Sequence, residues 1–259
     1  MKKLYPTCPE CGTTIPKFIN LVELHTCTST NSYVKDNINS LIDSSPVVIT
    51  AKIQTEGRGR SNRKWYSSDE GGLYFSLLLK TRNRENFKFF SIVAGIATVE
   101  TIKNITGLDA MLKWPNDIEI NEKKAGGILI ENQIFNNYLL SVVGIGLNVN
   151  NNISNIPSET PKKAISVSSV SGNKENLREI MENLVGTFLY FSKLLDEGKS
   201  DYILNIYSSS LKHRAGDPIT FHDGTSIVKG NFVRLDGKGG LVLKLPTGAE
   251  KTFFSGEIF

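Results

Sequence analysis

The chain has 259 residues, of which 39% are hydrophobic and 22% are charged, and its formal net charge is +4. This composition is ordinary for a globular protein, and the length suffices for one large domain plus a small one. Because no apolar run approaches the roughly 18 residues of a membrane span, we expect a soluble protein without membrane contact. The charge excess is too modest to demand a nucleic-acid partner.

The start of the chain, MKKLYPTCPE, lacks the apolar stretch of a signal peptide, and three cysteines cannot form a complete disulfide framework. Both features favour a reducing cytoplasm. Segment 1–20 is expected to be irregular. It contains CPECG, in which Cys8 and Cys11 have the spacing of a zinc knuckle, and His25 with Cys27 could complete the site. The usual second cysteine pair is absent, so a loose turn with free thiols is the favoured interpretation.

Strands and helices mix from residue 21 to about 200. Runs of β-branched and aromatic residues predict strands at 22–28, 47–53 and 73–80. Apolar residues at helical spacing predict helices over 28–42, 87–107 and about 174–197. Gly107 is placed to end the second helix. Three further apolar segments predict a β-meander, at 111–120, 125–132 and 138–150. This mixture predicts an α+β sheet domain.

The last part of the chain has a different pattern. Three turn signals, HDGTS, LDGKGG and LPTGAE, are spaced along short predicted strands at 218–221, 230–235 and 241–245. The pattern predicts a small all-β barrel or sheet of about 45 residues. Its boundary with the preceding domain is expected near 211–216.

The loop after strand 47–53 spans about twenty residues, a length that is usually functional or disordered. It contains GRGRSNRKW at 57–65, in which Gly57 and Gly59 allow close backbone approach to a ligand and the guanidinium groups suit carboxylate or phosphate. Gln54, at the end of the incoming strand, suits an amide or ureido group. Taken alone, the motif fits an exposed basic loop better than a ligand-binding loop. Such a loop would either contact RNA or have no binding partner.

A second motif, KWPND, covers residues 113–117. The proline holds Trp114 extended and makes the strand rigid where Asn116 and Asp117 are presented. Asp117 suits a Mg²⁺ ion carried by phosphates, because magnesium takes one or two carboxylates and keeps waters. An ordinary turn is the alternative, although the hydrophobic IEI that follows argues against it.

Two more motifs follow in the predicted meander. In KKAGGILIE, Lys124 precedes a glycine pair, so its ammonium group can lean over a ligand that lies against bare backbone. A solvated hairpin surface is the alternative. In GIGLNVN, at 144–150, glycines interrupt an apolar strand and suggest a close backbone approach, and Asn148 suits a base or ribose. A strand bulge is the alternative there.

In this order, TSTN, QTEGRGRSNRKW, KWPND, KAGGILIE and GIGLNVN together resemble the biotin protein ligases, also called biotin–[acetyl-CoA-carboxylase] ligases, from about residue 21 to the C-terminus. The resemblance implies a mixed β-sheet catalytic domain with helices packed on it, at 21–211, and a C-terminal SH3-like domain, at 212–259. It implies an ATP-dependent ligase that converts biotin and MgATP to biotinyl-5′-AMP. Biotin is then transferred to a specific lysine of a biotin carboxyl carrier protein or domain.

The resemblance also implies roles for individual residues. The expected biotin-binding residues are Ser29, Thr30, Asn31, Gln54, Gly57, Arg58, Gly59, Arg60, Lys124 and Gly127. The expected ATP-binding residues are Arg60, Arg63, Trp65, Asn116, Asp117, Lys124 and Asn148. Lys124, Arg60 and Asp117 are the expected catalytic residues, with Asp117 also the ligand for Mg²⁺. An anionic carboxylate must approach an anionic phosphate, so a cationic loop is needed to cancel their repulsion.

Two departures from the family pattern are visible. The family loop usually reads G-R-G-R-x-G-R-x-W, whereas Asn62 stands at the third glycine here. Asparagine tolerates left-handed backbone better than most residues, so we expect the loop to keep its path. The chain also stops at GEIF, immediately after the GEI that closes the family's C-terminal domain. About twenty residues precede the matching region, too few for a helix-turn-helix, so we predict no DNA binding.

Two rival functions stay open, and the chain is expected to be a monomer or homodimer. A lipoate or octanoate ligase or transferase has the same architecture but characteristically carries a different arginine- and glycine-rich stretch. An RNA-binding module would use the basic loop, but it leaves KWPND and GIGLNVN unexplained and lacks the usual aromatic platforms.

Overall fold

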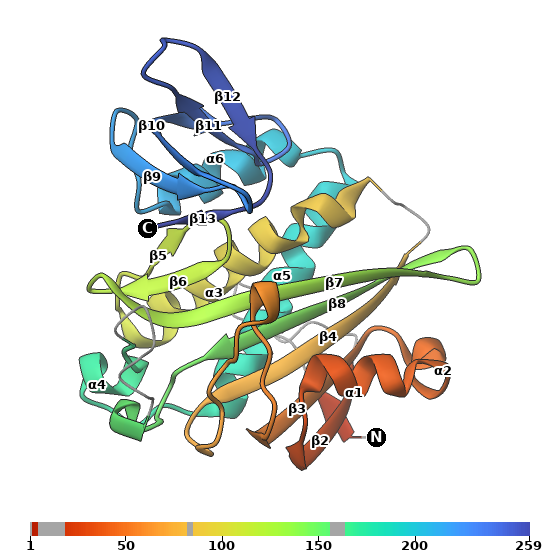
Figure 1. Cartoon of the computed structure of the whole chain (residues 1–259). Coiled ribbons are helices and arrows are strands. Elements are labelled where there is room, and N and C mark those ends of the chain that lie inside the picture. Colours follow the sequence, from red (N-terminus) through yellow and green to blue (C-terminus); the bar gives the residue numbers. More distant parts are fainter. Residues whose placement is uncertain (1, 5–18, 82–84, 156–163) are drawn as a thin grey trace.

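The structure is a computed structural model of the whole chain, and it describes residues 2–4, 19–81, 85–155 and 164–259. An eight-stranded sheet with the order β1-β2-β3-β4-β8-β7-β6-β5 forms its centre (Figure 1). The strands are β1 (Lys2–Leu4), β2 (Ile19–Cys27), β3 (Val47–Gln54), β4 (Leu73–Thr81), β5 (Met111–Lys113), β6 (Asp117–Ile120), β7 (Lys123–Phe135) and β8 (Tyr138–Leu147). β2 and β3 are parallel and the other neighbours are antiparallel, so the sheet is mixed, as predicted.

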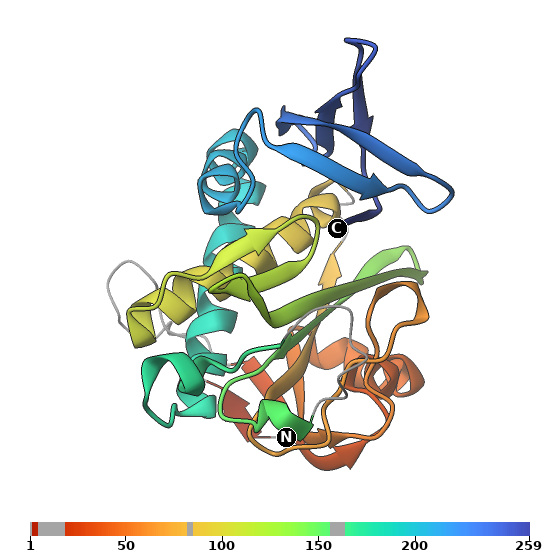
Figure 2. The same ribbon diagram turned by 60° about the vertical axis from the view of Figure 1, so that its left-hand side comes forward.

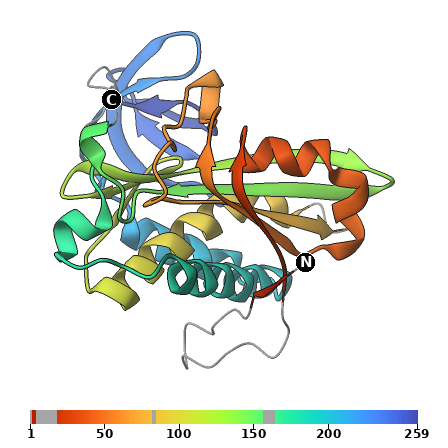
Figure 3. The same ribbon diagram turned by 90° about the horizontal axis from the view of Figure 1, so that it is seen from below.

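Helices cover both faces of this sheet (Figure 3). The larger core joins alternate strand residues such as Leu77 and Val143 to α3 (Phe90–Thr106), α5 (Leu177–Asp196) and α6 (Ser200–Ser210). Their neighbours, Leu78 and Val142, face the opposite way and pack against α1 (Thr30–Asp36) and α2 (Ile38–Leu41). This two-sided burial explains why β3, β4 and β8 read as continuous apolar runs. The β5-β6-β7-β8 antiparallel order confirms the predicted meander, but the segment expected as one strand at 111–120 is two strands joined by a turn at residues 114–116. KWPND therefore contains the turn that was the alternative.

The two long helices end where their sequences indicate, and each begins about three residues after its predicted start. Gly107 adopts a left-handed φ of 72° and ends α3 as predicted. Asn176 caps α5, its side chain accepting from the backbone N–H groups of Arg178 and Glu179. The rings of Phe90 and Phe188 meet edge to face at 5.6 Å, which fixes α5 against α3.

The predicted single helix over 28–42 is wrong in one respect, because it is broken at Asn37. The Asn37 side chain donates to the Tyr33 carbonyl at 2.9 Å, and its own backbone N–H binds the same oxygen. Its φ of −112° and ψ of 20° are not helical, so α1 stops there and α2 starts at Ile38. The predicted apolar face survives the break, since Val34, Ile38, Leu41 and Ile42 are all buried.

The C-terminal residues form a second, antiparallel sheet with the order β12-β11-β10-β9-β13, which lies apart from the first (Figure 2). Its strands are β9 (Pro218–His222), β10 (Ile227–Leu235), β11 (Leu241–Lys244), β12 (Glu250–Phe253) and β13 (Glu257–Ile258). It fits the small β-domain that the turn signals predict. The Trp114 indole N–H donates to the Gly239 carbonyl at 3.1 Å and its ring packs on Phe221, so the KWPND motif joins the two sheets.

Several short elements were not predicted from the sequence. They are β1, α4 (Val167–Ser171), α6, and the 3₁₀ turns at Ile42–Ser44, Arg60–Asn62, Asn86–Phe89 and Ile153–Asn155. The CPECG motif, with Cys8 and Cys11, lies outside the described residues. Among the residues that are described, no helix is long and apolar enough to cross a membrane.

We predict that Phe188→Ala lowers the free energy of unfolding by about 3–5 kcal/mol, because the ring is 1% exposed and its removal leaves a cavity between α3 and α5. Tyr202→Ala is the matched control on α6, where the ring is 54% exposed and the cost stays within about 0.5 kcal/mol. Urea denaturation measures both. Equal losses would contradict the packing of α5 on α3.

Candidate functional site

The basic loop of the sequence is a twisted hairpin that extends from β3. Gly59 N–H donates to Arg63 O at 2.7 Å and Trp65 N–H donates to Gly57 O at 2.8 Å, which pairs the two arms. At the tip, Ser61 and Asn62 have φ values of 53° and 58°. The left-handed backbone expected at Asn62 is therefore present, and Ser61 shares it. We call residues 55–66 the basic hairpin.

The glycines of this hairpin serve its own pairing. A Cβ atom at Gly57 would overlap the carbonyl oxygen of Trp65, and one at Gly59 would lie 3.3 Å from the carbonyl oxygen of Arg63. Gly57 is buried and lies outside the cavity described below. At Gly57, the close approach foreseen from the sequence is thus to the opposite arm of the hairpin.

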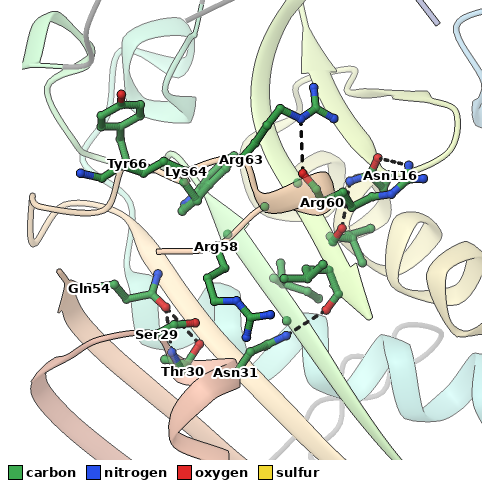
Figure 4. Close-up of a pocket in the computed structure, with 18 of the residues that line it drawn as sticks. Ser29, Thr30, Asn31, Gln54, Arg58, Arg60, Arg63, Lys64, Tyr66 and Asn116 are labelled. Atoms are coloured by element: carbon green, nitrogen blue, oxygen red, sulfur yellow. Dashed lines mark hydrogen bonds between the residues drawn. The ribbon is translucent and has the colours of Figure 1, made fainter. Parts of the chain in front are cut away.

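The basic hairpin covers a cavity of about 160 Å³ above β4, β7 and β8 (Figure 4). The sequence-predicted residues that line it are Ser29, Thr30, Asn31, Gln54, Arg58, Gly59, Arg60, Arg63, Trp65, Asn116, Lys124, Gly127 and Asn148. Gly57 and Asp117 do not line it. The lining residues that sequence reasoning missed are Lys64, Tyr66, Phe75, Ile128, Leu129, Ile145, Ala164 and Glu257. Gly144 and Gly146, the glycines of GIGLNVN, also line the cavity and make the close approach expected of them. The motifs therefore converge on one cavity, as the resemblance implies.

A buried chain of hydrogen bonds forms the polar end of the cavity. Thr30 N–H donates to Gln54 Oε1 at 2.8 Å, which orients the Gln54 amide, and Gln54 Nε2 donates to Ser67 Oγ at 3.1 Å. Ser76 Oγ lies 2.7 Å from Thr30 Oγ1 and 2.6 Å from Asn31 Oδ1. Ser76 was missed, although a lone serine inside the apolar strand LYFSLLLK is the signal that would have found it.

Trp65 lies flat across two neighbouring strands at Gly127 and Gly146. These glycines are paired in register on β7 and β8, and a Cβ at Gly146 would come within 2.7 Å of the indole. The Trp65 Nε1 atom is buried and has no hydrogen-bond partner among the described residues. The Lys124 ammonium lies 5.6 Å from the ring centroid. Because Gly127 and Gly146 have no side chains, the indole ring can lie directly against the two strands. We call this surface the glycine seat.

Lys124 also forms a close ion pair with Asp117. The distance from Lys124 Nζ to Asp117 Oδ1 is 2.6 Å, and the Asp117 side chain is only 9% exposed. The two residues lie on adjacent strands, β7 and β6, on either side of a register shift in their pairing. Asp117 therefore stands behind Lys124, which is the residue that faces the cavity.

The tip of the basic hairpin is held by the C-terminal sheet. Arg60 Nη1 donates to Asn116 Oδ1 at 3.0 Å and to the Gly256 carbonyl at 3.3 Å, while Arg63 Nη1 binds Glu257 Oε1 at 2.7 Å. Burial, and then the neighbouring charge of Arg63, lower the pKa of Arg60. The GEI motif at the end of the chain thus belongs to the site.

Asn148 is fixed on all sides except one. Its backbone N–H donates to Ala125 O at 2.7 Å and its carbonyl accepts from Val167 N–H at 2.9 Å. The Asn151 side chain donates to Asn148 Oδ1 at 3.0 Å, and both side chains are buried. In this arrangement the amide nitrogen of Asn148 is the group left for a ligand.

Fold and cavity together define an α+β protein with a small cavity that is lined by several cationic side chains and covered by the basic hairpin. A model described as the biotin/lipoate A/B protein ligase family matches residues 24–150. The biotin–[acetyl-CoA-carboxylase] ligase of Paracoccus denitrificans is 30% identical over 220 residues, covering 80% of this chain and 90% of that protein. The chain belongs to the biotin/lipoate protein ligase family.

Two other relatives differ in extent. The bifunctional ligase/repressor BirA of Bacillus spizizenii is 36% identical over 143 residues, which cover 54% of this chain and 44% of that protein. The chain therefore matches less than half the length of this bifunctional relative. The biotin protein ligase from Aquifex aeolicus, solved in complex with biotin and ATP, has a TM-score of 0.79 and 31% identity, covering 93% of this chain and 97% of that one.

We predict that Gly146→Ala displaces the indole of Trp65, because the added Cβ would lie 2.7 Å from it. Acrylamide quenching of tryptophan fluorescence should increase, since Trp114 is 4% exposed and stays protected. Gly237→Ala is the control, because no atom lies within 4 Å of the Cβ added there. Unchanged quenching in Gly146→Ala would place Trp65 elsewhere.

Proposed function

We propose that this protein is a biotin protein ligase, with residues 21–211 as catalytic domain and 212–259 as C-terminal domain. It activates biotin with ATP to biotinyl-5′-AMP and transfers biotin to a lysine of a biotin carboxyl carrier protein or domain. The observation that carries the proposal is the single cavity with a polar end at Thr30 and Gln54 and a cationic end at Arg60 and Lys124. The names of the Paracoccus and Aquifex relatives support it.

The cavity suits an elongated molecule with a polar ring and an acidic end. Ser29, Thr30 and Gln54 offer both donors and acceptors for a ureido ring at one end. Apolar side chains such as Phe75 and Ile145 line the cavity and suit the remainder of the molecule. The carboxylate then points toward the cations under the hairpin.

The first step joins two anions. The biotin carboxylate attacks the α-phosphorus of ATP, a carboxylate–phosphorus bond forms, and the bond to the β-phosphate breaks as pyrophosphate leaves. Arg60, Arg63 and Lys124 line the cavity where negative charge develops, so they lower the free energy of the transition state. Asn148 donates to the nucleotide. Catalysis rests on positioning and electrostatics, with no covalent nucleophile from the protein.

Magnesium fits the site only as an ion carried mainly by the phosphates. The Asp117 carboxylate is paired with Lys124, and the side-chain oxygen of Asn116 accepts from Arg60. No cluster of three His, Cys, Asp or Glu residues exists in the described ranges. Asp117 would hold the ion once Lys124 turns to the phosphates, with waters filling the remaining positions. Mg²⁺ supplies charge neutralisation on the triphosphate.

In the second step the carrier lysine amine attacks the acyl carbon of the anhydride. An amide bond forms, the acyl–oxygen bond breaks, and AMP leaves. The RNA-binding interpretation of the basic hairpin finds no support, because Arg58, Arg60 and Arg63 line the cavity and have partners inside the protein.

ATP–pyrophosphate exchange with magnesium tests the proposal, run in parallel with biotin, lipoate and octanoate. We expect exchange with biotin alone. Exchange with lipoate or octanoate, and none with biotin, would replace the proposal by the lipoate or octanoate ligase alternative. Exchange with none of them would show that the fold does not carry this chemistry here.

We predict that Lys124→Ala lowers the rate of biotin-dependent exchange by about 10²–10³, because a donor to the developing charge is lost. Its neighbour Lys123 is exposed, so Lys123→Ala is the control and keeps the wild-type rate. A wild-type rate in folded Lys124→Ala would contradict the role given to Lys124.

A further inference from the structure

Glu131 does not line the cavity, but it binds the basic hairpin that covers the cavity. Glu131, on β7, is outside the lining residues, and its side chain is 18% exposed. The Arg58 guanidinium binds both of its oxygens, Nη2 to Oε1 at 2.8 Å and Nη1 to Oε2 at 3.3 Å. Lys35 Nζ lies 2.7 Å from Oε1, and Asn31 Nδ2 donates to Oε2 at 3.0 Å. Four contacts therefore converge on one carboxylate.

The pair with Arg58 attaches one arm of the basic hairpin to the main sheet. Arg58 opposes Lys64 across the hairpin, so holding Arg58 holds both arms. A planar guanidinium on a carboxylate fixes direction as well as distance. Besides Glu131, the Arg58 guanidinium contacts the Ser32 hydroxyl at 3.3 Å. The charge of Arg58 is thus balanced by the Glu131 carboxylate.

Glu131 also reaches the polar floor of the cavity. Asn31 donates to Glu131 through Nδ2 and accepts from Ser76 through Oδ1 at 2.6 Å, and Ser76 continues to Thr30. Burial opposes ionisation of Glu131, but the hydrogen bonds from Lys35, Asn31 and Arg58 hold its pKa below the ordinary value. The carboxylate is therefore charged at neutral pH and ties the floor to the cover.

We propose that Glu131 is a positioning residue that latches the basic hairpin over the cavity through Arg58 and so sets how long the acyl-adenylate is retained. This inference rests on the proposed function. An exposed ion pair would contribute little to such a latch. The Glu131 pair differs because its carboxylate is only 18% exposed, although Arg58 is 39% exposed, and because that carboxylate is bonded twice by Arg58 and shared with the floor of the cavity.

The test measures how fast enzyme loaded with biotin and ATP releases biotinyl-5′-AMP. Glu131→Gln keeps the shape of the side chain but removes the charge that binds Arg58, and we expect release to rise about tenfold to a hundredfold. The KM for ATP stays within about threefold of wild type. Lys35→Met removes a cation from the same carboxylate without touching the hairpin, and its release also stays within about threefold.

A double-mutant cycle separates the latch from a general structural role. Arg58→Gln should raise release at least as much as Glu131→Gln, and the double variant should add nothing, since both changes break one ion pair. Arg58→Lys keeps the positive charge but loses the two-pronged guanidinium contact, so we expect an intermediate release rate. If Glu131→Gln does not fold, Arg58→Lys replaces it in the test. If the increases in release rate multiply in the double variant, or if Glu131→Gln releases biotinyl-5′-AMP at the wild-type rate, the proposed latch is overturned.

Failure of the latch and failure of the proposed function are distinguishable. Exchange by the wild-type protein is measured first. No exchange with biotin would overturn both, whereas exchange with biotin and unaltered release from Glu131→Gln would overturn only the role of Glu131.

Discussion

The site depends on keeping several cations close together without letting their repulsion open the fold. Four of the five cations that line the cavity are therefore matched to oxygen partners inside the protein, and the fifth, Lys64, lies 5.3 Å from the centroid of the Tyr66 ring. Arg58 binds Glu131, Arg63 binds Glu257, Lys124 binds Asp117, and Arg60 donates to the carbonyl oxygens of Asn116 and Gly256. At an effective dielectric constant near 20, two like charges 4 Å apart repel by about 4 kcal/mol, so unpaired cations at this density would be costly.

The same pairing prepares the cavity for an anionic substrate. Phosphate and carboxylate oxygens can take over donors that the protein already holds in place, so little reorganisation is required when they arrive. The glycine seat under Trp65 and the hydrogen-bond chain from Gln54 to Asn31 act in the same direction, because they fix the apolar wall and the polar end of the cavity. The fold itself thus holds the apolar wall and the polar end of the cavity in place.

The features that were predicted correctly from the residues are those set by residues close together in the chain. The meander and the C-terminal end of α3 follow from hydrophobic periodicity and one glycine, which are properties of neighbouring residues, whereas the mixed sheet was implied by the family resemblance. The break at Asn37 was missed because a side-chain hydrogen bond to Tyr33 overrides the apolar period there. Thirteen predicted residues meet at one cavity. Glu131 and Glu257 were not foreseen, because their partners lie 73 and 194 positions away in the chain.

The contacts at the tip of the basic hairpin have a consequence for synthesis of the protein. Arg60 meets a carbonyl 196 positions later, and Arg63 meets a carboxylate 194 positions later, on the last strand of the chain. Domains generally fold in order of emergence from the ribosome, so the large sheet can form while the last strand is still in the exit tunnel. The contacts at the tip of the basic hairpin are therefore completed only once Gly256 and Glu257 are available, later than the large sheet.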